Sequence, residues 1–141
     1  MRFMLLMITG GYEKAVPGQL PDVDAMLAMG RYNEELQKAG VLLALDGLRA
    51  PAEGARVTFK GGKPTVTDGP FAEAKEVIGG YWIIQVKSLA EAIEWVSRCP
   101  VSDTDTVEVR QMFEFSDFPA EFQDACAADQ FPAMKARREQ L

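Results

Sequence analysis

Two aspartates that precede glycines are the side chains of this sequence best placed for chemistry. Asp46 and Asp68 each stand before a glycine at the end of a segment with the character of a strand. Such a pair favours a turn, because Asp can hydrogen-bond its own backbone and Gly accepts unusual φ values. If both pairs met in one cleft, however, the two carboxylates would move their pKa values apart and supply an acid and a base. The structural and the catalytic interpretations both stay open.

Histidine is absent from the sequence, which limits the chemistry further. The commonest general base near neutral pH, the commonest metal ligand and every Ser–His or Cys–His nucleophile are thereby excluded. Any acid–base work would fall to Asp, Glu, Tyr, Lys or Cys. The candidates are Asp46, Asp68 and Tyr32, although a tyrosine on the inward stripe of a helix is more often part of the core. No metal-ligand cluster, phosphate loop or nucleotide motif occurs, so we expect neither a metal nor a cofactor.

Four further residues are candidates for ligand contact. Met29 shares the inward stripe of the first predicted helix with Tyr32, and Tyr12 lies in a glycine-rich loop that could cover a cleft. Phe71 follows the second Asp-Gly pair, where it would either anchor the loop in the core or line a site. Arg49 could bind a ligand carboxylate through two hydrogen bonds. We therefore predict a small organic ligand in a cleft between the sheet and the first helix.

Composition and charge describe a single globular domain. The chain has 141 residues, 48% of them hydrophobic, and a net charge of -6, which disfavours nucleic acid because phosphate binding depends on Lys and Arg. No apolar run approaches the roughly 18 residues of a membrane span, and the first apolar run is too short for a signal peptide. The two cysteines form no CxxC motif. We expect a cytoplasmic protein with inert thiols.

The elements that must position these residues alternate between strands and helices. Strands are predicted over residues 2–8, 41–45, 80–86 and 106–112, helices over 22–39 and from 88 to about 100, and a hairpin over 55–60 and 64–67 around Gly61-Gly62. With the hairpin set apart, the order is βαββαβ, an α+β ferredoxin-like unit with an inserted hairpin. Asp22 is expected to cap the first helix and Gly40 to end it, and Ser88-Leu89-Ala90-Glu91 is a capping box for the second helix. Both helices would cover one face of the sheet. We expect a second copy to cover the other face, which predicts a homodimer.

A C-terminal extension, residues 113–141, follows the predicted domain of residues 1–112. It carries five of the eight phenylalanines: Phe113, Phe115, Phe118, Phe122 and Phe131. Disordered tails are poor in aromatic residues. We therefore expect the extension to pack on the domain or on the dimer partner.

Several of these motifs together resemble a known family, the DGPF branch of the YCII-related proteins. The matching residues are Thr67-Asp68-Gly69-Pro70-Phe71-Ala72-Glu73, Lys75-Glu76 and Gly79-Gly80-Tyr81, supported by Gly40, Asp46-Gly47-Leu48, Glu91-Ala92, Pro100 and Val107-Glu108-Val109-Arg110. The resemblance covers about residues 1–112. It implies a dimeric α/β barrel built from ferredoxin-like units.

The resemblance implies less about activity. Some relatives are proposed to be enzymes with a His and an Asp in a cleft, by analogy with barrels that process muconolactone-like compounds. That His corresponds to a position near Met29 here, and the sequence has no histidine, so the His-based chemistry is not carried over. Many DGPF members are similar to proteins found beside or fused to extracytoplasmic-function sigma factors. A non-catalytic regulatory or accessory protein that partners such a sigma factor is therefore the alternative to a small-molecule site.

Overall fold

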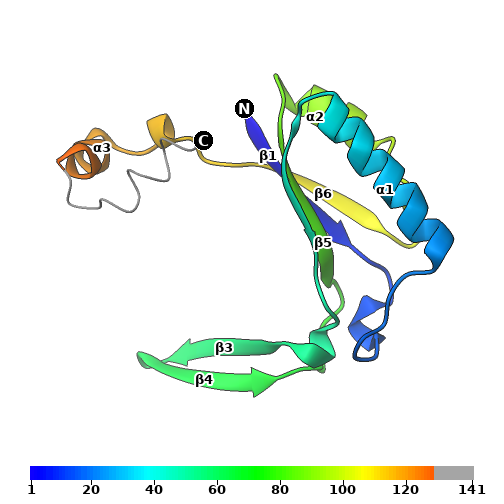
Figure 1. The fold of residues 1–141 in the computed structure, drawn as a ribbon. Helices are drawn as coiled ribbons and strands as arrows, with labels where there is room; N and C mark the ends of the chain where they lie inside the picture. The colour runs from blue at the N-terminus through cyan, green and yellow to red at the C-terminus, as the bar shows by residue number, and fades with distance from the viewer. Residues whose placement is uncertain (129–141) are drawn as a thin grey trace. The chain divides into compact units, whose positions relative to one another are not determined.

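The computed structural model describes residues 1–128. The chain divides into two compact units, residues 1–111 and residues 112–141. The first unit contains a four-stranded antiparallel sheet, two α-helices and a separate β-hairpin (Figure 1). No helix within the described part of the chain combines the length and the apolar character needed to cross a membrane.

The main sheet has the strand order of a ferredoxin-like unit. Its strands are β1 (Arg2–Ile8), β2 (Leu42–Gly47), β5 (Ile78–Gln85) and β6 (Thr106–Gln111), in the order β2-β5-β1-β6. All three neighbouring pairs are antiparallel, and the sheet is open rather than closed into a barrel within one chain. The predicted α+β fold with its βαββαβ order is therefore confirmed.

One face of this sheet forms the hydrophobic core. Phe3, Leu5 and Met7 alternate with half-buried residues along β1, and the register places Leu5 opposite Trp82 on β5. Side chains of directly paired residues share a face, so these residues point together toward the helices. Both helices lie on this side of the sheet (Figure 1). The opposite face carries the alternate residues of each strand.

The two helices begin where capping residues were expected. Helix α1 (Val23–Lys38) starts after Asp22, whose side chain accepts a hydrogen bond from the Ala25 amide at 2.9 Å. It ends before Gly40, which has a φ of 70°. Helix α2 (Leu89–Val96) starts after Ser88, whose Oγ accepts from the Glu91 amide at 3.1 Å.

The predicted capping box of α2 is only half formed. Glu91 Oε2 accepts a hydrogen bond from the Lys87 amide at 2.8 Å, one residue before the Ser88 amide that a capping box would use. The helix is also shorter than predicted, because it ends at Val96 rather than near Pro100.

The hairpin consists of β3 (Ala55–Lys60) and β4 (Lys63–Asp68). Gly61 and Gly62 join them with φ values of 57° and 76°, as the favoured two-residue turn requires. Every residue of both strands is exposed. An isolated two-stranded hairpin is marginally stable at best, so its attachment at the open end matters.

The second unit begins with a short 3₁₀ segment, Phe115–Asp117, followed by helix α3 (Ala120–Ala127). Phe113, Phe115, Phe118 and Phe122 form a cluster with ring centroids 5.3–6.5 Å apart. Cys126 is buried within the same unit. Phe131 lies outside the described residues, and the expected docking of this extension stays a prediction.

Candidate functional site

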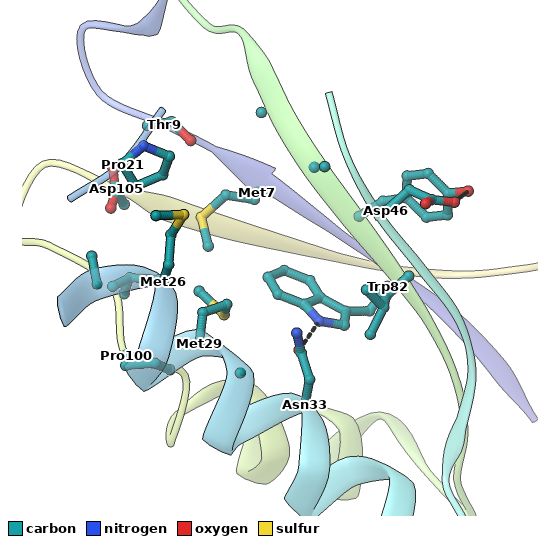
Figure 2. A pocket seen from close by; sticks show the side chains of 18 of the residues that line it. Met7, Thr9, Pro21, Met26, Met29, Asn33, Asp46, Trp82, Pro100 and Asp105 are labelled. Atoms are coloured by element: carbon teal, nitrogen blue, oxygen red, sulfur yellow. Dashed lines mark hydrogen bonds between the residues drawn. The ribbon is translucent and has the colours of Figure 1, made fainter. Parts of the chain in front are cut away.

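A cleft of about 460 Å³ opens between helix α1 and the main sheet (Figure 2). Its walls come from α1, from the neighbouring ends of β1, β2 and β5, and from the loop between α2 and β6. The lining residues are Met7, Thr9, Pro21, Ala25, Met26, Met29, Gly30, Asn33, Leu45, Asp46, Gly47, Gly79, Gly80, Tyr81, Trp82, Pro100, Val101, Ser102 and Asp105. This is the position predicted for the ligand cleft.

The spacing of the inward-facing residues along α1 explains why the cleft lies beside the first half of this helix. Residues on the inward stripe of α1 recur every three or four positions. Tyr32 and Leu36, in the second half of the stripe, are buried in the core, whereas Ala25 and Met29, in the first half, face the cleft instead. The N-terminal half of the helix therefore leaves its apolar face available to a ligand.

Three methionines and one tryptophan contribute large apolar side chains to the walls. Met7 enters from β1, Met26 and Met29 enter from α1, and the indole of Trp82 closes the inner end (Figure 2). Methionine is unbranched and polarizable, so it adapts to ligands of varied shape and makes favourable contacts with aromatic rings. The walls thus suit a compact apolar molecule.

Asn33 places a polar group at the inner end of the cleft. Its Oδ1 accepts a hydrogen bond from Trp82 Nε1 at 2.8 Å (Figure 2). Trp82 is itself held by an edge-on contact with Tyr32, with ring centroids 6.1 Å apart. The amide of Asn33 is consequently fixed by a buried aromatic pair.

Asp105 stands at the other end of the cleft and joins two loops. Its Oδ1 accepts from the Gly10 amide at 3.0 Å, and its Oδ2 accepts from the Ser102 amide at 2.9 Å. Partial burial works against the charged form, but the hydrogen bonds from Ser102 and Gly10 outweigh it and lower the pKa of Asp105. The carboxylate is therefore ionised at neutral pH, and each of its oxygens accepts one hydrogen bond from the backbone.

Among the predicted site residues, Met29 and Asp46 line the cleft. Asp46, however, directs its carboxylate to the opposite face of the sheet from Trp82 (Figure 2). There its Oδ2 accepts a hydrogen bond from the Tyr81 hydroxyl at 3.1 Å, and this bond raises the pKa of Tyr81. Asp46 therefore contributes only its backbone to the cleft.

Tyr32 belongs to the core beneath the cleft. Its hydroxyl donates to the Trp95 carbonyl at 3.0 Å, and burial raises its pKa far above the ordinary value. A buried phenol with a satisfied hydrogen bond supports the helix packing.

The loop that contains Asp68 and Phe71 does not line the cleft. The Gly69 amide donates to the Gly54 carbonyl at 2.9 Å, and a β-carbon on Gly69 would overlap the Pro51 carbonyl oxygen. The Phe71 ring lies 3.9 Å from the guanidinium carbon of Arg56. These contacts make the loop a clasp at the open end of the hairpin.

Arg49 and Tyr12 are also engaged elsewhere. Arg49 forms an ion pair with Glu53 at 2.7 Å, and the Tyr12 hydroxyl donates to the Leu48 carbonyl at 2.6 Å. Neither side chain is among the described residues that line the cleft.

Of the lining residues that the sequence did not predict, Asn33, Trp82 and Asp105 bear most on the chemistry of the cleft. Asn33 follows Met29 by four positions, so the helical stripe carried a usable signal for it. Trp82 and Asp105 come from distant segments, and their approach to α1 depends on the sheet order.

The thiols and the acidic residues form no reactive centre in the described part of the chain. Burial, followed by the charge of Asp105, raises the pKa of Cys99 to about 11, which disfavours a reactive thiolate. Within residues 1–128 no three His, Cys, Asp or Glu side chains gather in a way that could hold a metal ion.

Comparison with known proteins identifies the family. The model of the YCII-related domain matches residues 1–116, so the chain belongs to the YCII-related family. One similar solved structure is the 5-chloro-2-hydroxyhydroquinone dehydrochlorinase from Burkholderia phenoliruptrix AC1100 in complex with 2,5-dihydroxybenzoquinone. It shares 15% sequence identity, and the match covers 84% of this chain and 100% of that one with a TM-score of 0.43. No curated protein matches the chain.

Proposed function

We propose that this YCII-related protein binds a small organic molecule, neutral and largely apolar, in the cleft between α1 and the sheet. The observation that carries the proposal is the cleft itself, a cavity of about 460 Å³ with methionine and tryptophan walls and few polar groups. Small-molecule sites have this character: concave, mostly apolar and furnished with a few polar groups that fix orientation.

Binding is favoured over acid–base catalysis by the state of the ionisable side chains. Among the described residues that line the cleft, these are Asp46, Tyr81 and Asp105. Asp46 and Tyr81 bond to each other on the opposite face of the sheet, and both oxygens of Asp105 accept backbone hydrogen bonds. Asp46 and Tyr81 are thus engaged with each other, and the lowered pKa of Asp105 makes it a weak base.

The charge of the cleft favours neutral ligands. No Lys or Arg is among the described lining residues, whereas Asp105 contributes a negative charge. An anion entering this cleft would lose hydration without gaining a cationic partner. Carboxylate ligands, which a role for Arg49 had suggested, are therefore disfavoured.

We also propose that two copies pair through the open face of the sheet, as the resemblance to the DGPF branch implies. Met4, Leu6 and Ile83 are half-buried residues on this face, and no helix of residues 1–111 packs on it. A second sheet would cover these apolar side chains. Leu6→Lys should convert a dimer into a monomer in sedimentation-velocity experiments; a wild-type protein that sediments as a monomer would contradict the proposal.

A thermal-shift screen of neutral ketones, amides and alcohols tests the binding proposal. A ligand at 100 times its Kd stabilises a protein by about 2.7 kcal/mol, or roughly 5–10 °C in a chain of this size. Ala25→Leu, which narrows the cleft, should remove the shift. The matched control Gln37→Leu adds the same side chain to an exposed position of α1 outside the cleft and should keep it.

Two results would contradict the binding site. One is a screen in which no compound shifts the wild-type protein. The other is a ligand whose shift survives Ala25→Leu unchanged, because that ligand would bind somewhere else.

A further inference from the structure

We infer that the side-chain amide nitrogen of Asn33 selects the ligand of this cleft by donating a hydrogen bond to a neutral acceptor, such as a carbonyl oxygen. The inference rests on the proposed binding function and adds the chemical class of the ligand. It depends on three features: the orientation of the amide, its surroundings and the charge of the cleft.

The orientation of the Asn33 amide follows from its partner. The indole N–H of Trp82 is a donor and has no acceptor capacity. The amide atom that faces it at 2.8 Å must therefore be the oxygen, Oδ1. The NH₂ group of Asn33 consequently points away from Trp82, and the amide cannot flip without opposing two donors.

The surroundings give this NH₂ group no partner of its own. Among the described residues, the hydrogen bond to Trp82 is the only one that the Asn33 side chain makes. Figure 2 shows Asn33 on α1 beside Met29, on the side of the helix that faces the cleft. A donor among apolar walls gains most from a ligand that supplies an acceptor, because a ligand without one leaves the donor unsatisfied.

The charge of the cleft selects among acceptors. Carboxylates and phosphates accept strongly, but they would enter a cleft that contains the carboxylate of Asp105 and that no described Lys or Arg lines. A ketone, amide, ester or lactone carbonyl accepts the same hydrogen bond without the cost of burying a charge. The geometry thus favours a neutral carbonyl compound over an organic acid.

The substitution Asn33→Asp tests whether the NH₂ group of Asn33 donates a hydrogen bond to the ligand. The new carboxylate can still accept from Trp82, while its second oxygen replaces the cleft-facing donor with an acceptor. Gln37→Glu adds the same charge to an exposed position one turn further along α1 and serves as the control. The probes are acetophenone, which has an acceptor, isopropylbenzene, which matches its shape without one, and benzoate, which carries the acceptor on an anion.

We expect Asn33→Asp to raise the Kd of acetophenone by about tenfold. Loss of a neutral hydrogen bond raises a Kd roughly twofold to tenfold, and the new acceptor adds repulsion with the carbonyl oxygen. The Kd of isopropylbenzene should change by less than about twofold in Asn33→Asp. In Gln37→Glu, the Kd values of acetophenone and isopropylbenzene should both stay within about twofold of wild type. Benzoate should bind the wild-type protein more weakly than acetophenone.

A second measurement needs no variant. Asn33 is the single asparagine of the sequence, so asparagine-selective ¹⁵N labelling yields one pair of side-chain NH₂ resonances. Acetophenone should shift this pair more strongly than isopropylbenzene does at equal occupancy.

The possible failures are distinguishable. If no probe binds the wild-type protein, the proposed function fails and the inference fails with it. A different failure is that acetophenone and isopropylbenzene both bind, but Asn33→Asp weakens their binding equally or the NH₂ resonances respond equally to both. The cleft would then be a binding site in which Asn33 does not select ligands by a hydrogen-bond acceptor. If benzoate binds more tightly than acetophenone, the neutral class is wrong.

Discussion

Replacing Gly69 with alanine should release the β3–β4 hairpin from its attachment. Gly69 sits where the hairpin returns to the body of the domain, with its amide bonded to the Gly54 carbonyl at 2.9 Å. A β-carbon at this position would overlap the Pro51 carbonyl oxygen, which is backbone and cannot rotate away. The loop must therefore move, and the hydrogen bond to Gly54 would be lost or stretched.

The cost can be worked from these two contacts. Overpacking against rigid surroundings costs about 1–3 kcal/mol, and a lost hydrogen bond costs about 0.5–1.5 kcal/mol. A local loss of about 2–4 kcal/mol corresponds to exchange that is roughly 30- to 1,000-fold faster for amides protected by the hairpin, up to the rate of an unstructured peptide. Native-state hydrogen exchange followed by NMR measures this effect strand by strand.

Gly47→Ala provides the matched control, because Gly47 belongs to the other Asp-Gly pair at a strand end. A β-carbon there would meet no atom within 4 Å. Exchange in the hairpin should stay at the wild-type rate. The clasp interpretation of the Asp68–Phe71 loop would be refuted if Gly69→Ala left hairpin exchange unchanged, or if both alanine variants accelerated it equally.

Three further predictions concern α1 and the loop contacts of the cleft. Gly30→Ala should raise the free energy of unfolding by about 0.8–1 kcal/mol in urea titrations, because Gly is unfavourable within a helix and the new methyl group enters open space; an unchanged midpoint would contradict this. Tyr32→Phe should cost about 1–2 kcal/mol in the same assay by removing the hydroxyl bonded to the Trp95 carbonyl, while ligand affinity should stay within about twofold. The lowered pKa of Asp105 means that its stabilisation is present above the ordinary Asp pKa of about 3.9 and is lost as the pH falls through the lower folded value. In Asp105→Asn, the free energy of unfolding should therefore fall less steeply as the pH is lowered into the acidic range. An unchanged pH dependence would show that Asp105 does not cause this loss of stability.

Local signals in the sequence predicted the elements and the place of the cleft. Asp22 and Gly40 bound the first helix as expected, and the apolar stripe through Met29 led directly to the cleft-facing side of α1. Glycines at a two-residue turn predicted the hairpin. Each of these features depends on residues a few positions apart, where backbone preferences and helical spacing act.

The features that the sequence did not predict depend on contacts between residues that are far apart in the chain. The face taken by the Asp46 carboxylate depends on an irregular register between Leu42 and Ala44, and such a shift changes which residues point to the core. The bond between Asn33 and Trp82 joins residues 49 positions apart. Likewise, the close approach of Gly69 to Pro51 exists only once the hairpin has folded back.

A titration monitored at the methionine methyl groups would test the central claim most directly. The chain has seven methionines; Met7, Met26 and Met29 line the cleft, whereas Met4 lies on the opposite face of the sheet. With ¹³C-methyl labelling and acetophenone as the ligand, the account predicts shifts at the three cleft methionines and an unchanged Met4. Shifts concentrated at Met4, or no shift at Met7, Met26 and Met29 at saturating ligand, would contradict a ligand site between α1 and the sheet.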